Sequence, residues 1–226
     1  MEKIYSVAVD GPSGAGKSTL AKAIAAELHI LYVDTGAIYR PIGCYARRKG
    51  VETADTEAVI ALLPEVEIGM CYDAQGLQHM LLHGEDVTEE IRLPEMSLYA
   101  SAVSAIPEVR AFLLEMQRDF ARKSSVIMDG RDIGTVVLPH ADVKIFLKAD
   151  VEVRARRREI ELQERGTPRP YEQVLEEMRQ RDYNDTHRSA APLRAAEDAV
   201  IVDTSDLDFQ QSKEKLLEII REKVGL

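Results

Sequence analysis

The chain has 226 residues, a hydrophobic content of 45% and a formal net charge of −10 at pH 7. This length is enough for one large or two small globular domains. The acidic balance argues against a broad nucleic-acid surface, because contact with DNA or RNA requires clustered Lys and Arg. Cys44 and Cys71 are the only cysteines, which excludes a disulfide framework and favours a reduced cytosol.

The N-terminal stretch MEKIYSVAVDG carries one lysine and a short apolar run that ends at Asp10. This pattern predicts a first strand over residues 6–9 rather than a signal peptide. Apolar runs in the chain stay far below the roughly 18 residues of a membrane span. We therefore expect a cytoplasmic protein without a membrane partner.

Short β-branched runs alternate with helix-length segments along the chain, which predicts crossover connections and a parallel sheet. The expected strands are 6–9, 31–33, 126–128, 143–147 and 200–202. One-sided apolar stripes predict a first helix through Leu20, Ile24 and Leu28 and a last helix through Leu216, Leu217, Ile220 and Val224. The fold class is α/β.

Two stretches interrupt this alternation. Residues 66–87 alternate weakly between turn signals, which predicts a small antiparallel hairpin. Residues 154–194 contain ten of the nineteen arginines and no lysine. We expect a single domain, residues 1–226, with inserts at about 64–95 and about 154–190.

The stretch AVDGPSGAGKSTL matches G-x-x-x-x-G-K-[ST] from Gly11 to Ser18, between an expected strand and an expected helix. Glycines allow successive backbone N–H groups to point inward, and with the helix N-terminus these amides form a phosphate site. Lys17 is expected to reach the β- and γ-phosphates, and the Ser18 hydroxyl to coordinate Mg²⁺. The expected nucleotide-binding residues are Gly11, Pro12, Ser13, Gly14, Ala15, Gly16, Lys17, Ser18 and Thr19.

Polar motifs follow two other expected strands, VDTGAIYR at 33–40 and MDGRDIGT at 128–135. The carboxyl ends of parallel strands are where open α/β folds bind ligands. Asp129 is in the position where phosphate-loop enzymes hold a carboxylate toward the metal. Capping of the turn that follows is its alternative role.

These motifs, with KIFL at 144–147, RDYND at 181–185 and His187-Arg188, resemble the bacterial cytidylate kinases along nearly the whole chain. The resemblance implies a three-layer phosphate-loop kinase fold with a five-stranded parallel sheet, a hairpin insert and a helical lid. It further implies transfer of the γ-phosphoryl group of ATP to CMP or dCMP, with Mg²⁺, by a monomer.

The resemblance also assigns the acceptor site. It implies contact with the acceptor phosphate for Thr35, Arg40, Arg131 and Arg181, with the base for Ser101, Arg110, Asp132 and Arg188, and with the sugar for Asp185 and Arg181. From residue type and helical setting alone, Ser101 and Arg110 would be surface residues. Pro41 departs from the family pattern, and proline disfavours a helical conformation of the preceding Arg40.

The arginine-rich region predicts two helices, 153–166 and one from Tyr171. On the second, Val174, Met178, Arg181, Asp185 and Arg188 share one stripe, which is natural for a lid over a nucleotide. Arg154, Arg157 and Arg158 are candidates for binding ATP phosphates, with Arg157 the first choice.

Catalysis is assigned to Lys17, Arg131 and Arg181. No general base is required, because the acceptor phosphate is ionised near neutral pH.

Three alternatives stay open at this point: a kinase for UMP, AMP or a small metabolite, a nucleotide-dependent switch, and a non-catalytic nucleotide-binding module. The switch is disfavoured because the chain has no N-K-x-D string for guanine. The other two are separated by measuring ADP production with different acceptors.

Overall fold

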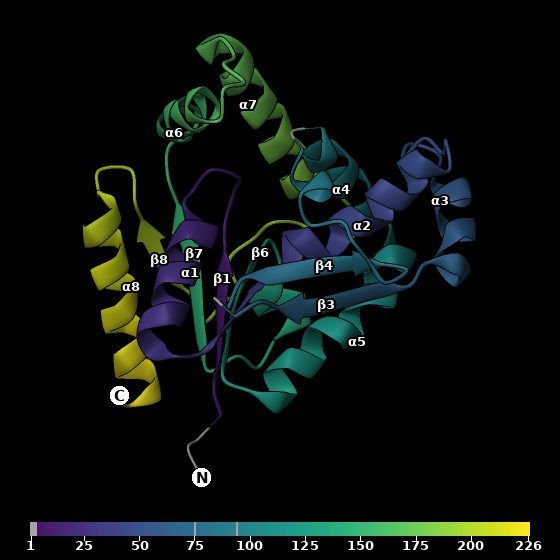
Figure 1. Cartoon of the computed structure of the whole chain (residues 1–226). Helices are drawn as coiled ribbons and strands as arrows, with labels where there is room; N and C mark the ends of the chain where they lie inside the picture. The colour runs from purple at the N-terminus through teal and green to yellow at the C-terminus, as the bar shows by residue number, and fades with distance from the viewer. Residues whose placement is uncertain (1–3, 75, 94) are drawn as a thin grey trace. The chain divides into compact units, whose positions relative to one another are not determined.

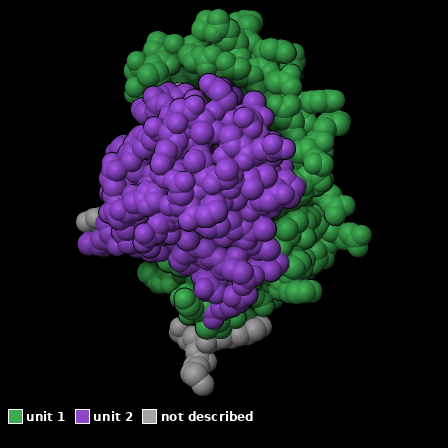
Figure 2. Space-filling view, turned by 90° about the vertical axis from the view of Figure 1, so that its right-hand side faces the viewer, with its two compact units in different colours: residues 1–32, 123–226 green, residues 33–122 purple. Residues whose placement is uncertain are grey.

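A computed structural model of the chain describes residues 4–74, 76–93 and 95–226. The chain divides into two compact units (Figure 2). The first unit consists of residues 1–32 and 123–226, and the second unit of residues 33–122. The organisation of residues 1–226 as one domain with two inserts stays a prediction.

The first unit is built on a five-stranded parallel sheet with the order β2-β6-β1-β7-β8. Its strands are β1 Ser6–Asp10, β2 Leu31–Asp34, β6 Val126–Gly130, β7 Val143–Lys148 and β8 Val200–Asp203, of which β2 continues into the second unit from Val33. Every strand expected from the sequence is confirmed, and each extends beyond the apolar run at its carboxyl end. The polar residues that follow the core therefore begin within the strands themselves.

Helices α1 Lys17–Leu28 and α8 Phe209–Val224 lie side by side against this sheet (Figure 1). The predicted apolar stripes face inward, and Ile24 and Ile220 are fully buried with the strand residues Val7 and Val9. Asp208 caps the first turn of α8 by accepting a hydrogen bond from the Gln211 N–H at 2.8 Å. This core holds β1 and α1 rigidly on either side of the predicted phosphate loop.

Helices α6 Val151–Glu164 and α7 Tyr171–His187 form a helical pair in the first unit, drawn in green in Figure 1. They share a small apolar core of Ala155, Leu162, Val174 and Met178. The predicted stripe on the second helix is confirmed for Val174, Met178 and Asp185, which are buried, whereas Arg188 is the C-cap beyond the last residue of α7 and has an extended backbone.

The second unit contains an antiparallel sheet with the order β3-β4-β5, formed by β3 Ile68–Tyr72, β4 Gln78–Leu82 and β5 Glu85–Asp86. The predicted hairpin is confirmed, with a short third strand added. Helices α2 Thr35–Arg48, α3 Thr56–Leu62, α4 Met96–Ser104 and α5 Pro107–Lys123 complete the unit, α5 ending at the boundary. Gln75 and Pro94, within the predicted insert 64–95, lie outside the described residues.

Helix α2 runs through Pro41 without a break. Proline lacks an N–H and removes the hydrogen bond to the carbonyl four residues earlier, yet Arg40 keeps a helical backbone. Buried neighbours on both sides of Pro41, Tyr39 and Ile42 among them, hold the helix in place. Packing thus overrides the tendency of Pro41 to keep the preceding residue, Arg40, out of a helical conformation.

Among residues 4–74, 76–93 and 95–226, no helix is both long enough and apolar enough to span a bilayer.

The second unit carries a pH-dependent contact at His79 on β4. Its Nδ1 lies 2.8 Å from Asp86 Oδ2 and its Nε2 lies 3.4 Å from Asp73 Oδ2. Hydrogen bonds to Asp86 and then to Asp73 raise the pKa of His79. The folded state therefore binds this proton more tightly than the unfolded chain.

We predict that His79→Gln lowers the midpoint of thermal unfolding near pH 6 and leaves it unchanged near pH 9. The stabilisation is fully present below the unfolded pKa of histidine and is lost as the pH rises through the higher folded value. The exposed His140, changed to Gln, is the control. An equal effect of His79→Gln at both pH values would contradict the assignment.

Candidate active site

The loop between β1 and α1 has the backbone of an anion-binding turn. Gly14 and Gly16 have φ of 76° and 88°, values that L side chains rarely adopt. A Cβ at Gly11 would lie 2.3 Å from the Leu147 carbonyl oxygen of β7. The motif glycines are therefore required by the close approach of the neighbouring strand and by the left-handed backbone. The predicted strand–loop–helix context is confirmed.

Lys17 lies at the first position of α1 and is only 5% exposed. Its Nζ donates a hydrogen bond to the Pro12 carbonyl at 2.7 Å, across its own loop. Burial, and then the neighbouring Arg131, lower the pKa of Lys17 well below its usual range. The Lys17 ammonium thus has two cations, Arg131 and Arg181, and two carboxylates, Asp129 and Asp10, among its charged neighbours.

The Ser18 hydroxyl donates to Asp129 Oδ2 at 2.8 Å, and the Tyr32 hydroxyl donates to Asp129 Oδ1 at 2.8 Å. Asp129 is buried at the end of β6, with only 4% of its surface exposed. The Tyr32 ring lies under the Lys22 ammonium, 5.6 Å from the ring centroid. Three elements, α1, β2 and β6, therefore meet at this carboxylate.

Tyr32 is not among the site residues predicted from the sequence. A tyrosine within a buried strand is a usable signal, because its hydroxyl needs a hydrogen-bond partner there.

Hydroxyl and carboxylate oxygens are the ligand types that Mg²⁺ takes, usually with several waters and substrate phosphates. Ser18 and Asp129 fit such an ion. Within the described part of the chain, no group of three or more His, Cys, Asp or Glu side chains could hold a metal by itself. The nucleotide and water would supply the remaining ligands of a magnesium ion bound here.

The turn after β6 carries two of the predicted acceptor residues. Arg131 donates from Nε to Asp185 Oδ2 of α7 at 2.7 Å, and Arg188 Nη2 lies 3.6 Å from Asp132 Oδ1. Burial alone would raise the pKa of Asp185, but Arg131 and the arginines beyond it hold that pKa below its usual value. The predicted acceptor residues of the first unit, namely Arg131, Asp132, Arg181, Asp185 and Arg188, therefore form one charged cluster.

The three candidate arginines of α6 have different surroundings. Arg154 donates to the Ser13 carbonyl of the phosphate loop at 3.0 Å and to Asp182 of α7. Arg157 donates to the Thr204 carbonyl at 2.6 Å, after β8. Arg158 pairs with Glu161 on its own helix at 2.7 Å. The structure thus joins Arg154, rather than the first-choice Arg157, to the phosphate loop. A role of Arg157 toward ATP stays a prediction.

In the second unit, Thr35 is the first residue of α2 and is buried, with Asp34 capping the helix by accepting from the Ala37 N–H at 3.0 Å. Ser101 lies on α4 and Arg110 on α5. Arg110 is 9% exposed, so residue type alone would misplace it at the surface.

The Arg110 guanidinium contacts two groups of its own unit. It donates to the Ser104 carbonyl at 3.1 Å and lies 5.6 Å from the centroid of the Tyr39 ring. A guanidinium over an aromatic face at this distance makes a cation–π contact. Tyr39 immediately precedes Arg40 on α2. Two predicted acceptor residues, Arg110 and Arg40, therefore lie at the same stretch of this helix.

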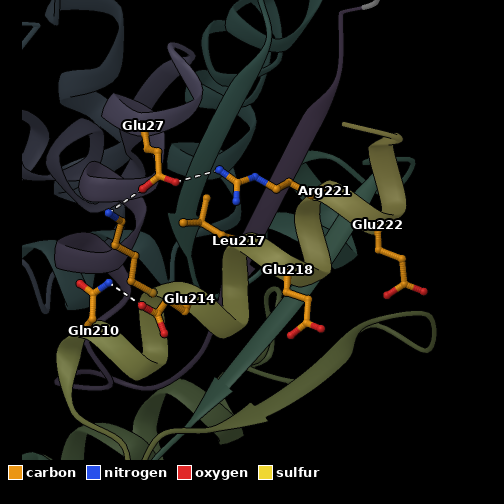
Figure 3. Close-up of a pocket in the computed structure, with 8 residues that line it drawn as sticks. Glu27, Gln210, Glu214, Leu217, Glu218, Arg221 and Glu222 are labelled. Carbon is orange, nitrogen blue, oxygen red and sulfur yellow. Dashed lines mark hydrogen bonds and ion pairs between the residues drawn. The ribbon is translucent and has the colours of Figure 1, made fainter.

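A groove between α1 and α8 is unrelated to these residues (Figure 3). Glu27 pairs there with Lys213 at 2.6 Å and Arg221 at 2.8 Å. Glu214, Glu218 and Glu222 also line the groove, so that with Glu27 it has four acidic side chains against two basic ones, Lys213 and Arg221. An acidic lining of this kind does not suit a polyphosphate.

Comparison with known proteins gives a consistent result. A sequence model of the family described as cytidylate kinase matches residues 7–222. A cytidylate kinase of Caldicellulosiruptor saccharolyticus is 48% identical over 225 residues, covering 100% of this chain and 99% of that protein. A cytidylate kinase of a Geobacillus species is 45% identical over 225 residues, with 100% of both chains covered.

Among solved structures, an uncharacterised protein from Eubacterium ventriosum superposes with a TM-score of 0.52 at 12% identity, covering 97% of this chain and 99% of that one. At this identity the likeness supports the fold alone.

We predict that Tyr32→Phe weakens Mg²⁺-dependent binding of ATP by about tenfold or more, because it removes a hydroxyl that orients Asp129 while keeping the ring. Binding of ATP in the presence of EDTA should stay unchanged. Isothermal titration calorimetry measures both. Tyr45→Phe is the matched control, since the Tyr45 hydroxyl also donates to a carboxylate, Glu65, at 3.0 Å. Equal loss with and without Mg²⁺ would contradict the role of Tyr32.

Proposed function

The chain belongs to the cytidylate kinase family, and on this premise we propose that it transfers the γ-phosphoryl group of ATP to CMP or dCMP, producing ADP and CDP or dCDP. The proposal is carried by Lys17 at the phosphate loop, which has Arg131 and Arg181 as well as the carboxylates of Asp129 and Asp10 as charged neighbours. Besides burial, both arginines contribute to the lowered pKa of Lys17. Bringing like charges together costs free energy, and bound phosphates would offset that cost.

The donor nucleotide would bind through the phosphate loop. Backbone N–H groups from Gly11 to Thr19, except at Pro12, which has none, would surround the phosphates at the N-terminus of α1. Lys17 would leave the Pro12 carbonyl to meet the β- and γ-phosphates. Ser18 and Asp129 would hold Mg²⁺, which neutralises charge on the transferring group. Tyr32 and Ser18 orient the Asp129 carboxylate from its two sides.

The acceptor phosphate would bind Arg131 and Arg181, whose planar guanidinium groups can each hold two oxygens. Asp132 accepts a hydrogen bond from the exocyclic amine of cytosine, and Arg188 donates to the base. Uracil has an oxygen in place of that amine and would face Asp132 with an acceptor. Such a site rejects the wrong base because buried partners are left unpaired.

The remaining contacts follow from the family. Asp185, together with Arg181, is proposed to bind a sugar hydroxyl. Thr35 and Arg40 of the second unit are proposed to bind the acceptor phosphate, and Ser101 and Arg110 the base.

Catalysis requires alignment and charge neutralisation rather than covalent chemistry. The attacking oxygen belongs to a phosphate with a second pKa near 6, so it is already ionised at neutral pH. Lys17, Arg131 and Arg181 would stabilise the charge that spreads over the equatorial oxygens in the transition state. In this account no side chain has to remove a proton from the nucleophile.

Helices α6 and α7 are proposed to act as a lid that excludes water from the reaction. Arg154 connects this helical pair to the phosphate loop through the Ser13 carbonyl. The protein is further proposed to act as a monomer in the cytoplasm, where its free cysteines, Cys44 and Cys71, stay reduced.

The test of the proposed function is ADP production with ATP and each of CMP, dCMP, UMP and AMP. We expect rapid turnover with CMP or dCMP, slower turnover with UMP, and background rates with AMP. A preference for AMP, UMP or another small acceptor would indicate a kinase of different specificity. ATP binding without ADP formation in any mixture would indicate a non-catalytic module.

We predict that Lys17→Ala and Arg181→Ala each reduce kcat/KM by about a hundredfold or more, with unfolding midpoints close to that of the unmodified protein. A coupled assay of ADP release measures the loss. Arg179→Ala is the matched control on the same helix, because Arg179 is 53% exposed and pairs with Glu152. Near-normal turnover of either active-site variant would reject its role.

A further inference from the structure

The Asp10 carboxylate, at the end of β1, is 4% exposed and belongs to none of the contacts proposed for ATP or CMP. Oδ1 accepts a hydrogen bond from the Ile133 N–H at 2.7 Å, and Oδ2 accepts one from the Gly134 N–H at 2.7 Å. Each oxygen thus holds one of two successive amides in the turn after β6.

That turn is a single wide helical turn over Ile133–Val137. The first N–H groups of a helical turn have no carbonyl partner within it, and here Asp10 supplies both acceptors. The Val136 N–H bonds to the Asp132 carbonyl at 2.9 Å, and the Leu138 N–H to the Ile133 carbonyl at 2.7 Å. Asp10 therefore anchors the start of a turn whose later amides are satisfied internally.

Arg131 and Asp132 directly precede the two anchored amides. Asp132 has φ of −148° and ψ of 27°, a conformation outside the common helical and strand regions. Neighbouring bonds must hold it there. A shift of the anchored amides would re-aim both side chains.

A second anchor comes from β7. Lys144 is 9% exposed, and its Nζ donates to the Pro139 carbonyl at 2.6 Å, beyond the far end of the turn. A Cβ at Gly134 would lie 3.2 Å from Lys144 Cδ and 3.4 Å from Asp10 Oδ2. The turn is thus enclosed between one buried acid and one buried base from adjacent strands.

Burial of Asp10 is costly for the fold. Burial raises its pKa to about 7 in spite of the two backbone hydrogen bonds, with Asp132 adding to the rise and Lys17 opposing it. Among the residues that the structure describes, no basic side chain forms a direct salt bridge with Asp10, so a charge here is an expensive way to satisfy two amides. A role in placing functional side chains accounts for that cost.

The geometry points to Asp10 as a positioning residue that sets acceptor affinity and the preference for cytosine over uracil, by fixing the turn that aims Arg131 and Asp132. This inference rests on the proposed function. It concerns the acceptor side of the reaction and leaves the donor side to the phosphate loop.

The test is the variant Asp10→Asn, assayed with CMP and UMP as acceptors. One oxygen becomes an NH₂ group that faces a backbone N–H, so one anchor is lost at nearly constant size. We expect the KM for CMP to rise by about tenfold or more, and the ratio of kcat/KM for CMP over UMP to fall by a similar factor. The KM for ATP should stay within about twofold.

Asp142→Asn is the matched control. Asp142 Oδ2 accepts from the Ser6 N–H at 2.8 Å, at the opposite end of the same strand, and the variant should keep both KM values and the base preference. Lys144→Met removes the second anchor and should raise the KM for CMP in the same direction.

The inference is overturned if Asp10→Asn folds with unchanged KM for CMP, or if it raises the KM values for CMP and ATP equally. Should Asp10→Asn fail to fold, Lys144→Met decides, since an unchanged KM for CMP in that variant also overturns the inference. The proposed function fails separately, when the unmodified protein itself does not phosphorylate CMP or dCMP.

Discussion

Strands β1 and β6 run parallel, and their register pairs Val9 with Asp129 and Asp10 with Gly130. Parallel neighbours deliver their carboxyl ends to the same edge of a sheet. The phosphate loop leaves β1 at this edge and the Arg131–Asp132 turn leaves β6 beside it. The side chains that bridge the two loops, Asp10 among them, can do so only because this register holds.

Charge buried at that edge distinguishes the site from the rest of the first unit. The charged side chains at most 5% exposed there are Asp10, Lys17, Asp129, Asp132, Arg154 and Asp185. Such groups are rarely buried unless they are paired or hydrogen-bonded. The buried Arg154 guanidinium is an example, since it donates hydrogen bonds to the carbonyls of Ala149 and Ser13 and to the Asp182 carboxylate. Burial of the apolar core beneath the site, with Val7, Val9 and Ile24, stabilises the fold and offsets the free-energy cost of burying these charges.

Much of this arrangement could be predicted from the sequence, because it depends on local signals. The strands follow from β-branched runs, the phosphate loop from glycine spacing, and the apolar stripe of α7 from helical periodicity. Contacts between residues far apart in the chain could not be predicted this way. Asp10 bonds to amides 123 and 124 residues away, and Ser18 and Tyr32 meet Asp129 across 111 and 97 residues. Arg110 shows the same limit, since its guanidinium lies over the Tyr39 ring of another helix, 5.6 Å from the centroid.

We propose that the phosphate loop and the turn after β6 serve the two phosphates of one transfer. A crystal structure with CMP and a non-hydrolysable ATP analogue is the sharpest test. We expect the γ-phosphate on the loop amides and Lys17, the CMP phosphate on Arg131 and Arg181, and the cytosine amine within hydrogen-bond distance of Asp132. CMP bound away from Arg131 and Asp132 would overturn this proposal.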